Sequence, residues 1–264
     1  MTINSYFLKI ENKIIMKNKI ISLSAVLLVF YSSVFSQESK GNDPVTESKI
    51  KFKITSDVVS TYIWRGTVAN LHPNIQPTIA IVSGGFELGV WGSTDFGASY
   101  KEVDPYITYT IKSFKIGIAD YNWTFANSNY FDYNKSSTDH IIEASLSFLG
   151  TEKIPLSIAL NTMIYGADKK WDKSAGGFST TQNYSTYIEF GWAFKNFNLF
   201  LGVTPSNGYY GAGYGKIDGL QVCNLGLTSV RNINITPAFQ LPLKGTVYVN
   251  PQAESIHFVI GITL

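Results

Sequence analysis

The chain is poor in charged residues, in cysteine and in long apolar runs, and the last two shortages each exclude a class of protein. Charged side chains are 15% of the 264 residues, against roughly 25% in ordinary soluble domains. The single cysteine, Cys223, excludes an internal disulfide framework and a metal site built on several cysteines. Beyond residue 36 the sequence has no run of about 20 apolar residues, which excludes membrane-spanning helices there.

Residue types that carry catalysis are also scarce. The three histidines, His72, His140 and His257, lack the short fixed spacing of metal ligands. No serine is marked out as a nucleophile by a histidine partner. The glycine-rich run 208–219 opens no helix, so it does not predict a phosphate-binding loop. We therefore expect no enzymatic activity and no cofactor.

Residues 1–49 are typical of the start of an exported protein. Residues 16–19 are basic, and an apolar run of about 16 residues follows, from Ile20 to about Phe35. This pattern predicts a signal peptide over residues 1–36, and we hypothesise that translation starts at Met16. The run is shorter than the ~20 residues of a membrane anchor. Residues 37–49 are polar and aperiodic, which predicts a flexible periplasmic lead-in.

The charge balance does not favour a nucleic-acid partner. Residues 1–36 contain four lysines and one glutamate of the 21 basic and 19 acidic residues. Their removal leaves 17 basic and 18 acidic residues and a net charge of −1. Such a chain has no electrostatic basis for binding nucleic acid.

From residue 50 onward, apolar and polar residues alternate. In the last stretch Phe258, Ile260 and Ile262 share one face, whereas His257 and Gly261 fall on the other. We predict twelve strands, at 51–66, 75–82, 86–96, 102–112, 114–125, 142–148, 156–165, 187–195, 197–204, 220–231, 233–249 and 255–264. A tilted strand needs ~9–11 residues to cross a membrane. The alternation is less regular in the fifth, tenth and eleventh segments, so ten or fourteen strands are alternatives.

The lengths of the joins between these segments sort by strand number. Joins after even-numbered strands are mostly tight, at 83–85, 113, 149–154, 195–196 and around Asn232. Joins after odd-numbered strands are mostly longer, at 66–74, 126–138, 166–182 and 205–219, with short ones at 97–101 and 250–253. Short periplasmic turns and long outer loops are typical of outer-membrane barrels. A soluble sandwich has no reason to sort its joins in this way.

These patterns predict an all-β fold: a transmembrane antiparallel up-and-down β-barrel of about 12 strands over residues 50–264, of the bacterial outer-membrane type. Membrane lipids would surround it, and the barrel-insertion machinery would read its C-terminal strand. A homo-oligomer is compatible with the prediction. The alternative is a soluble periplasmic barrel that binds an apolar ligand, in which the apolar face of each strand would form the core.

Aromatic residues gather where the predicted strands end. Those near the longer joins are Tyr62, Trp64, Tyr121, Trp123, Tyr165, Tyr184, Tyr209 and Tyr210, and those at the opposite end are Trp192 and Phe194. Two such bands predict girdles at the two interfaces of a membrane. Aromatic residues favour strands in any protein, so strand propensity alone is the alternative explanation of the bands.

Several short motifs resemble one protein family. They are 62–66 (Tyr-Ile-Trp-Arg-Gly), Gln76-Pro77, 85–93 (Gly-Phe-Glu-Leu-Gly-Val-Trp-Gly-Ser), Glu102-Val103-Asp104 and 117–121 (Gly-Ile-Ala-Asp-Tyr). Over roughly 52–125 the chain resembles the TorF-type outer-membrane porin family, a conserved-hypothetical barrel family. The resemblance implies a porin-like barrel whose solute is poorly defined, and it implies no catalytic residues.

Charged residues on the inward face are the candidate pore lining. They are Lys51, Lys53, Asp57, Arg65, Glu87, Asp95, Glu102, Asp104, Lys112, Glu143, Glu189 and Lys244. Charges of both signs can line a wet pore and tune its ion preference, or they can pair across the lumen and plug it. We expect a porin-like channel for passive diffusion of small hydrophilic solutes or ions. A closed structural or adhesive barrel, acting through loops 126–138, 166–182 and 205–219, is the alternative.

Overall fold

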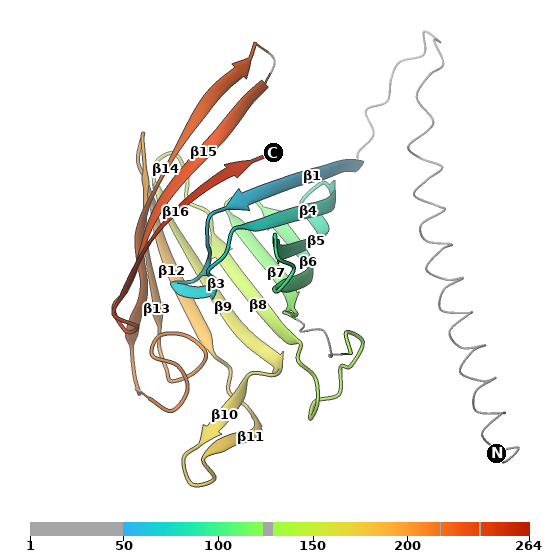
Figure 1. Cartoon of the computed structure of the whole chain (residues 1–264), viewed down its shortest axis with the longest axis vertical. Helices are drawn as coiled ribbons and strands as arrows, with labels where there is room; N and C mark the ends of the chain where they lie inside the picture. The colour runs from blue at the N-terminus through green and yellow to red at the C-terminus, as the bar shows by residue number, and fades with distance from the viewer. Residues whose placement is uncertain (1–49, 124–128, 217, 238) are drawn as a thin grey trace, which may run out of the picture. The chain divides into compact units, whose positions relative to one another are not determined.

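A computed structural model describes residues 50–123, 129–216, 218–237 and 239–264. The predicted signal peptide, 1–36, and lead-in, 37–49, lie outside these ranges. The described chain is all-β, and twelve of its strands form one closed antiparallel barrel, which confirms the predicted fold and strand number (Figure 1). No helix in the described ranges is long and apolar enough to cross a membrane.

The wall follows the order of the chain around the ring, as in an up-and-down barrel. Its strands are β1 (Ile50–Val59), β4 (Asn74–Ser83), β5 (Phe86–Asp95), β6 (Lys101–Ile111), β7 (Phe114–Tyr121), β8 (Ile141–Phe148), β9 (Leu156–Gly166), β12 (Thr186–Ala193), β13 (Asn198–Thr204), β14 (Gln221–Thr236), β15 (Phe239–Asn250) and β16 (Ser255–Thr263). β1 pairs with both β4 and β16, which closes the ring. Two short hairpins lie within joins: β2 (Tyr62–Trp64) with β3 (Thr67–Asn70), and β10 (Lys169–Asp172) with β11 (Gly177–Gln182).

The joins confirm the predicted sorting by length. We call one end of the barrel the turn end, because it carries the joins 84–85, 112–113, 149–155, 194–197 and 237–238, together with the start of β1 and the end of β16. The other is the loop end, which carries the joins 60–73, 96–100, 122–140, 167–185, 205–220 and 251–254. In Figure 1 the turn end is at the top, and the β10–β11 hairpin marks the loop end at the bottom.

Three predicted boundaries were wrong. The strand predicted at 114–125 ends at Tyr121, and residues 124–125 lie outside the described ranges. The strand predicted at 51–66 ends at Val59, and its last residues belong to the β2–β3 hairpin, because Arg65 and Gly66 have φ of 52° and 82° and cannot continue a strand. The turn predicted around Asn232 is also wrong, because Asn232 lies inside β14 and pairs with Pro242 of β15. Pro242 is tolerated there because it lies beyond the part of β15 that pairs with β16.

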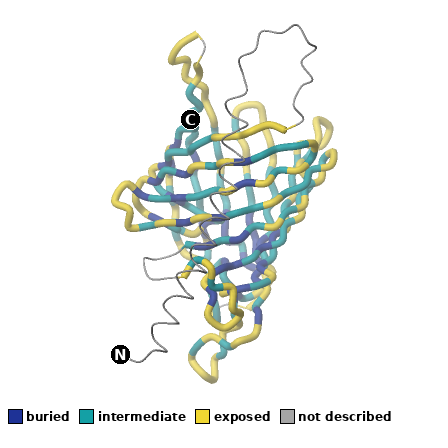
Figure 2. Tube along the Cα trace, turned by 90° about the vertical axis from the view of Figure 1, so that its right-hand side faces the viewer, coloured by how far each residue is buried: buried dark blue, intermediate teal, exposed yellow. Residues whose placement is uncertain are grey.

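The burial pattern is the reverse of a soluble protein. Apolar side chains cover the outside of the wall, where Ile54 is 75% exposed and Ile79 is 60% exposed. Among the described residues, 21 buried side chains are polar or charged and 10 are hydrophobic. Figure 2 shows that the buried positions gather in the half of the barrel nearer the loop end. The interior of this barrel is therefore polar, and densely packed only toward that end.

Neighbouring strands of the ring differ in how many residues they pair. β1 and β16 share three register pairs, Asp57 with Thr263, Val58 with Ile262 and Val59 with Gly261. The other neighbouring wall strands share between six and eleven pairs. Backbone bonds between Ser56 and Leu264, and from Ser60 N to Ile260 O, extend this seam a little. The closing contact is thus the shortest one in the wall.

We predict that the β1–β16 seam opens before the rest of the barrel. Protection from hydrogen exchange follows the local free energy of opening, and the seam has the fewest ladder bonds to break. In native-state hydrogen exchange, the amides of Ser56, Ser60 and Leu264 should exchange before those of Leu146 and Leu160 in the β8–β9 pair. Equal protection in the two regions would contradict the prediction.

Candidate functional site: the polar lumen and its hairpin

The β2–β3 hairpin lies inside the barrel and organises the loop-end half of the lumen. The positive φ values of Arg65 and Gly66 are those of the primed turns that join tight hairpins. Gly66 packs so closely against the backbone of Cys223 in β14 that any side chain at this position would collide with it. The Gly66 carbonyl also accepts a hydrogen bond from Asn250 Nδ2 of β15, at 3.1 Å. The hairpin follows β1 in the chain, so its tip crosses part of the lumen to make these contacts.

Arg65 ties the hairpin tip to a further part of the wall. Its guanidinium donates to both carboxylate oxygens of Glu143 in β8, at 2.5 and 2.8 Å, and to the Tyr210 hydroxyl. The Arg65 side chain is 13% exposed and that of Glu143 is 2% exposed, so this bidentate ion pair is largely shielded from water. The rings of Trp64, Tyr187 and Tyr210 lie 4.8 to 5.4 Å from the guanidinium carbon, within range of cation–π attraction.

The surroundings keep this cluster balanced in charge. Burial by itself would lower the pKa of Arg65, but Tyr210 and Glu143 outweigh it and raise the pKa above its ordinary value. Burial, and then the charge of Glu102, raise the pKa of Tyr209 to about 12, and burial also raises that of Tyr210. The cluster therefore consists of one ion pair enclosed by neutral phenols.

Aromatic rings fill the space around the hairpin. The Trp64 ring lies 5.3 Å from Tyr121, 5.6 Å from both Tyr209 and Tyr210, and 6.0 Å from Trp123. The structure corrects the expected role of these five residues, which pack against one another inside the lumen instead of forming an outward girdle. Their rings narrow the lumen at the level of the hairpin.

The long join 205–220 contributes the tyrosines and is fixed by a buried carboxylate. Asp168, which is fully buried, accepts hydrogen bonds from Ser185 N at 2.8 Å, Ser185 Oγ at 2.6 Å and Tyr214 Oη at 2.5 Å. The Ser185 hydroxyl in turn accepts a bond from Tyr209 N at 2.9 Å. This network connects two loop-end joins, 167–185 and 205–220, and places Tyr209 and Tyr210 over the lumen.

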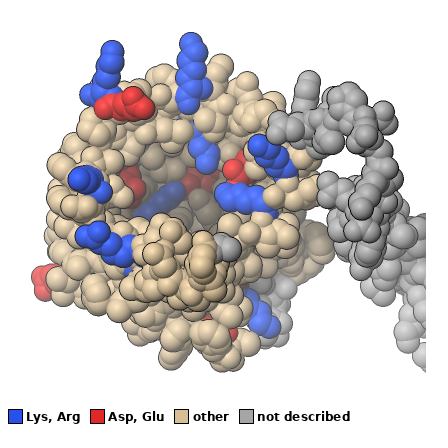
Figure 3. Space-filling model, turned by 90° about the horizontal axis from the view of Figure 1, so that it is seen from above, with Lys and Arg blue, Asp and Glu red and all other residues tan. Residues whose placement is uncertain are grey.

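Two hollows lie on either side of the hairpin. The larger has a volume of about 650 Å³ and is lined by polar wall residues, among them Lys53, Glu87 and Ser145, with Tyr62 and Trp64 bounding it. The smaller has a volume of about 300 Å³ and is bounded by the same two aromatic residues. The hairpin therefore divides the lumen into two compartments. Figure 3, viewed from the turn end, shows that the barrel is hollow there, with basic and acidic side chains inside.

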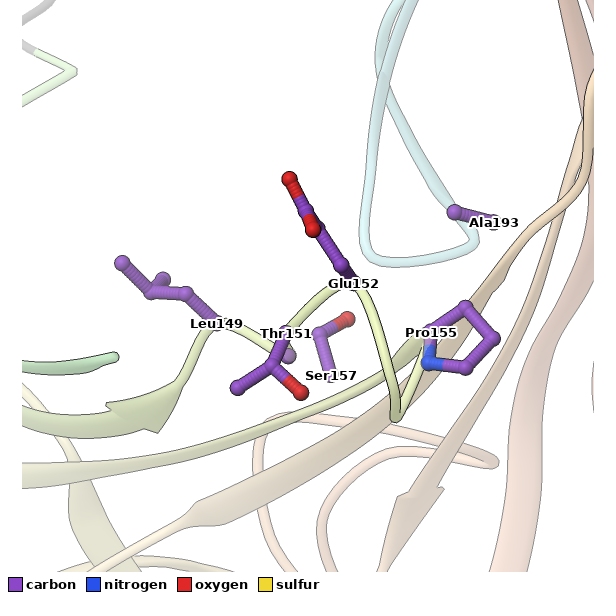
Figure 4. Close-up of a pocket in the computed structure, with 8 residues that line it drawn as sticks. Leu149, Thr151, Glu152, Pro155, Ser157 and Ala193 are labelled. Carbon is purple, nitrogen blue, oxygen red and sulfur yellow. The ribbon is translucent and has the colours of Figure 1, made fainter. Parts of the chain in front are cut away.

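A further hollow lies under the join 149–155 and lacks a binding constellation. It has a volume of about 370 Å³ and lies against β9 and β12, where Gly191 leaves room beside Ser157. In Figure 4 the Glu152 side chain extends away from Pro155 and Ser157, so no set of polar groups converges here. We therefore place the candidate site in the main lumen.

The predicted lining residues divide into groups. Lys53 and Glu87 form an ion pair at 3.2 Å in the larger hollow, and Asp104 and Glu143 also border it. The other carboxylates accept hydrogen bonds from residues near them in the wall or its joins. Glu102 accepts one from Tyr100 Oη at 2.7 Å, and Glu189 accepts one from Tyr187 Oη at 2.5 Å. Asp95 accepts one from Ser99 N at 2.7 Å, and Asp57 accepts one from Thr263 Oγ1 at 2.6 Å and lies 4.0 Å from Lys244.

Three predicted lining residues need separate comment. Lys51 is exposed at the turn end of β1. Lys112 was misplaced, because it lies in the β6–β7 turn with φ of 53° and is exposed, instead of lying on the inward face of a strand. Arg65 was also misplaced, because it belongs to the hairpin inside the lumen and not to the wall.

The sequence patterns placed Tyr121, Tyr209 and Tyr210 in an interfacial band and did not predict their contacts in the cluster or the Asp168 network. Alternation marks Tyr187 as inward, but nothing local marks Tyr210 as a partner of Glu143. It also missed His140, which is fully buried; its Nδ1 lies 2.8 Å from Asp120, and its ring stacks on Tyr133 at 4.2 Å. Among the described residues no group of three or more His, Cys, Asp or Glu is arranged to hold a metal.

Two comparisons with known proteins found no match. No protein-family model matches the chain, and no curated protein sequence matches it.

We predict a strong thermodynamic coupling between Arg65 and Glu143. Replacing one partner of a buried ion pair leaves the other charge unpaired and costs about 3–5 kcal/mol. Arg65→Ala and Glu143→Ala should each lower the unfolding free energy in detergent by this amount, and the double variant should cost much less than their sum. The control is the more exposed pair, Lys53→Ala with Glu87→Ala, where coupling should stay below about 1 kcal/mol. Additive costs for Arg65 and Glu143 would contradict the prediction.

Proposed function

We propose that the protein is a porin-like channel of a bacterial outer membrane, passing small hydrophilic solutes or ions by passive diffusion. The observation that carries the proposal is the inverted wall, apolar outside and polar inside, around a hollow lumen. It acts without a catalytic step or a cofactor.

A membrane is the environment that suits this outer surface. Ile54, Ile79 and Phe258 are each at least 60% exposed, and in water such side chains would be left without the stabilisation of burial. A closed barrel is the only sheet that satisfies its backbone groups in lipid. A soluble barrel that binds an apolar ligand would need an apolar interior, and the buried polar side chains argue against it. We also propose that the barrel-insertion machinery recognises β16.

The lumen suits small polar solutes better than large ones. Lys53, Glu87 and Thr108 offer charged and hydroxyl groups in the larger hollow, which opens toward the turn end. A solute crossing the barrel has to pass the level of Trp64 and Arg65. The hairpin thus acts as the constriction of the channel, and conduction depends on how far its ion pair with Glu143 opens.

The second candidate is a closed barrel that acts through its loops. The observation that favours it is the packing of Arg65, Glu143 and Tyr210 at the loop end, where one neutral ion pair and several rings occupy the lumen. Such a barrel would insert into membranes and pass no current. Its joins 122–140, 167–185 and 205–220 would then be the functional surface.

Planar-bilayer recording of the purified protein separates the two candidates. A channel gives discrete current steps, and Arg65→Ala with Glu143→Ala should raise the unit conductance severalfold because it removes the constriction without leaving a buried charge unpaired. The matched control, Lys53→Ala with Glu87→Ala, removes an ion pair that lines the larger hollow and should change the conductance much less. If the barrel inserts into the bilayer but neither the wild type nor the Arg65→Ala, Glu143→Ala variant passes current, the channel is ruled out and the closed barrel is favoured.

Ion preference gives a second test of the lumen. Lys53→Glu places a negative charge in the larger hollow, so the reversal potential under a salt gradient should shift toward cation selectivity. Lys112→Glu makes the same change in the exposed β6–β7 turn, outside the lumen, and should shift the potential far less. Equal shifts in the two variants would mean that Lys53 does not line the conducting path.

A further inference from the structure

The smaller hollow beside the β2–β3 hairpin has walls made largely of aromatic rings. Its volume is about 300 Å³. Its aromatic lining residues come from the hairpin and from three loop-end joins, and they are Tyr62, Trp64, Tyr100, Trp123 and Tyr209. Thr67 also lines the hollow and is exposed, which opens the hollow to solvent. A hollow of this size can hold one small organic molecule.

Three of these rings meet at steep angles, as adjoining walls of a box do. The Trp64 and Tyr209 rings lie 5.6 Å apart at 76°. The Trp123 ring lies 6.0 Å from Trp64 at 57° and 5.8 Å from Tyr209 at 53°. The Tyr62 and Tyr100 rings, which line the same hollow, are also steeply tilted, at 78°. Rings tilted in this way can present several faces to one enclosed space, and the face of an aromatic ring attracts a cation.

A buried carboxylate borders the same hollow. Alternation along β6 directs Glu102 inward, where it is 4% exposed. It lines the hollow and accepts a hydrogen bond from Tyr100 Oη at 2.7 Å. Asp104, two residues further along the same strand, is equally buried and accepts a bond from Asn122 N at 3.0 Å. Two buried carboxylates therefore lie together beside the aromatic walls.

Neither carboxylate has a basic partner within the described ranges. The ion pairs of these ranges are Lys53–Glu87, Arg65–Glu143, His140–Asp120 and Lys244–Asp57. Arg65 belongs to the hairpin that borders the hollow, but its charge is already balanced by Glu143. Buried carboxylates are rarely left without a partner, because their charge is costly to remove from water. A cation in the hollow would supply the partner that Glu102 lacks.

We propose that the smaller hollow binds one small organic cation of the quaternary ammonium class. The rings of Trp64, Trp123 and Tyr209 would surround the ammonium group, and Glu102 would balance its charge. A metal ion would instead require several oxygen ligands, and the described residues contain no group of three or more His, Cys, Asp or Glu arranged to hold one. Binding at this site does not require the barrel to conduct.

The test compares choline with neohexanol, the uncharged alcohol of nearly the same shape in which carbon replaces the ammonium nitrogen. Each is titrated into the purified, detergent-refolded protein in excess sodium chloride, and binding is followed by calorimetry and by tryptophan fluorescence. Choline should bind at least about tenfold more tightly than neohexanol, because only choline gains the attraction of the rings and of Glu102. Equal binding of the two, or no binding of choline, would overturn the proposal.

Matched substitutions locate the site. Glu102→Gln removes the charge and keeps the size of the side chain, so it should weaken choline binding at least about tenfold and leave neohexanol binding unchanged. Its control, Glu254→Gln, makes the same change at an exposed position of the loop end and should leave both unchanged. Trp123→Leu should weaken choline binding about fivefold or more, whereas Trp192→Leu, near the turn end of β12, should not.

The outcomes separate this site from the proposed channel. Only barrels that show heat-modifiable migration are compared, and the choice between choline and neohexanol in the wild type needs no variant at all. Equal loss of choline binding in Glu102→Gln and Glu254→Gln would overturn the site. A barrel that prefers choline but passes no current would support the site and rule out the channel. A conducting barrel that binds both compounds alike would keep the channel and overturn the site.

Discussion

The structure depends on one constraint, the pairing of every strand with two neighbours so that the backbone ladder closes on itself. Each wall strand is joined to the next along the chain, and the ring is completed where β1 meets both β4 and β16. Closure removes free edges along most of the wall.

Closure also decides what the interior is made of. With apolar side chains outside, the alternate positions of every strand face one another across a narrow space, and they are mostly polar. Polar groups removed from water need partners, and here they find them by crossing the lumen. Arg65 is the clearest case, because its hydrogen bonds to Glu143 and Tyr210 connect the β2–β3 hairpin to β8 and to residues 205–220. The lumen is divided at the level of the hairpin because Arg65, Glu143 and Tyr210 meet there.

Local sequence patterns predicted the strands well, because each side chain of a wall strand points either into the lumen or out of the barrel. The alternation of β4, β5 and β6 gave both their extents and their faces, because a strand has a side-chain period of two residues. It failed at Asn232, where a residue typical of turns lies inside a long strand, and at residues 60–66, where the alternation continues although the chain has left the wall. Periodicity cannot distinguish a strand of the wall from a hairpin packed against it.

The sequence by itself determined the all-β class, the twelve-strand wall, the inward and outward faces and the sorting of joins by length, because these follow from patterns within a few residues of one another. Only the tertiary structure decided which inward residues meet. Arg65 and Glu143 are 78 positions apart, and Asp57 and Thr263 are 206 apart. Their contacts depend on ring closure, strand tilt and the path of a hairpin through the lumen, and no local pattern encodes these because they arise from the pairing of all twelve strands together.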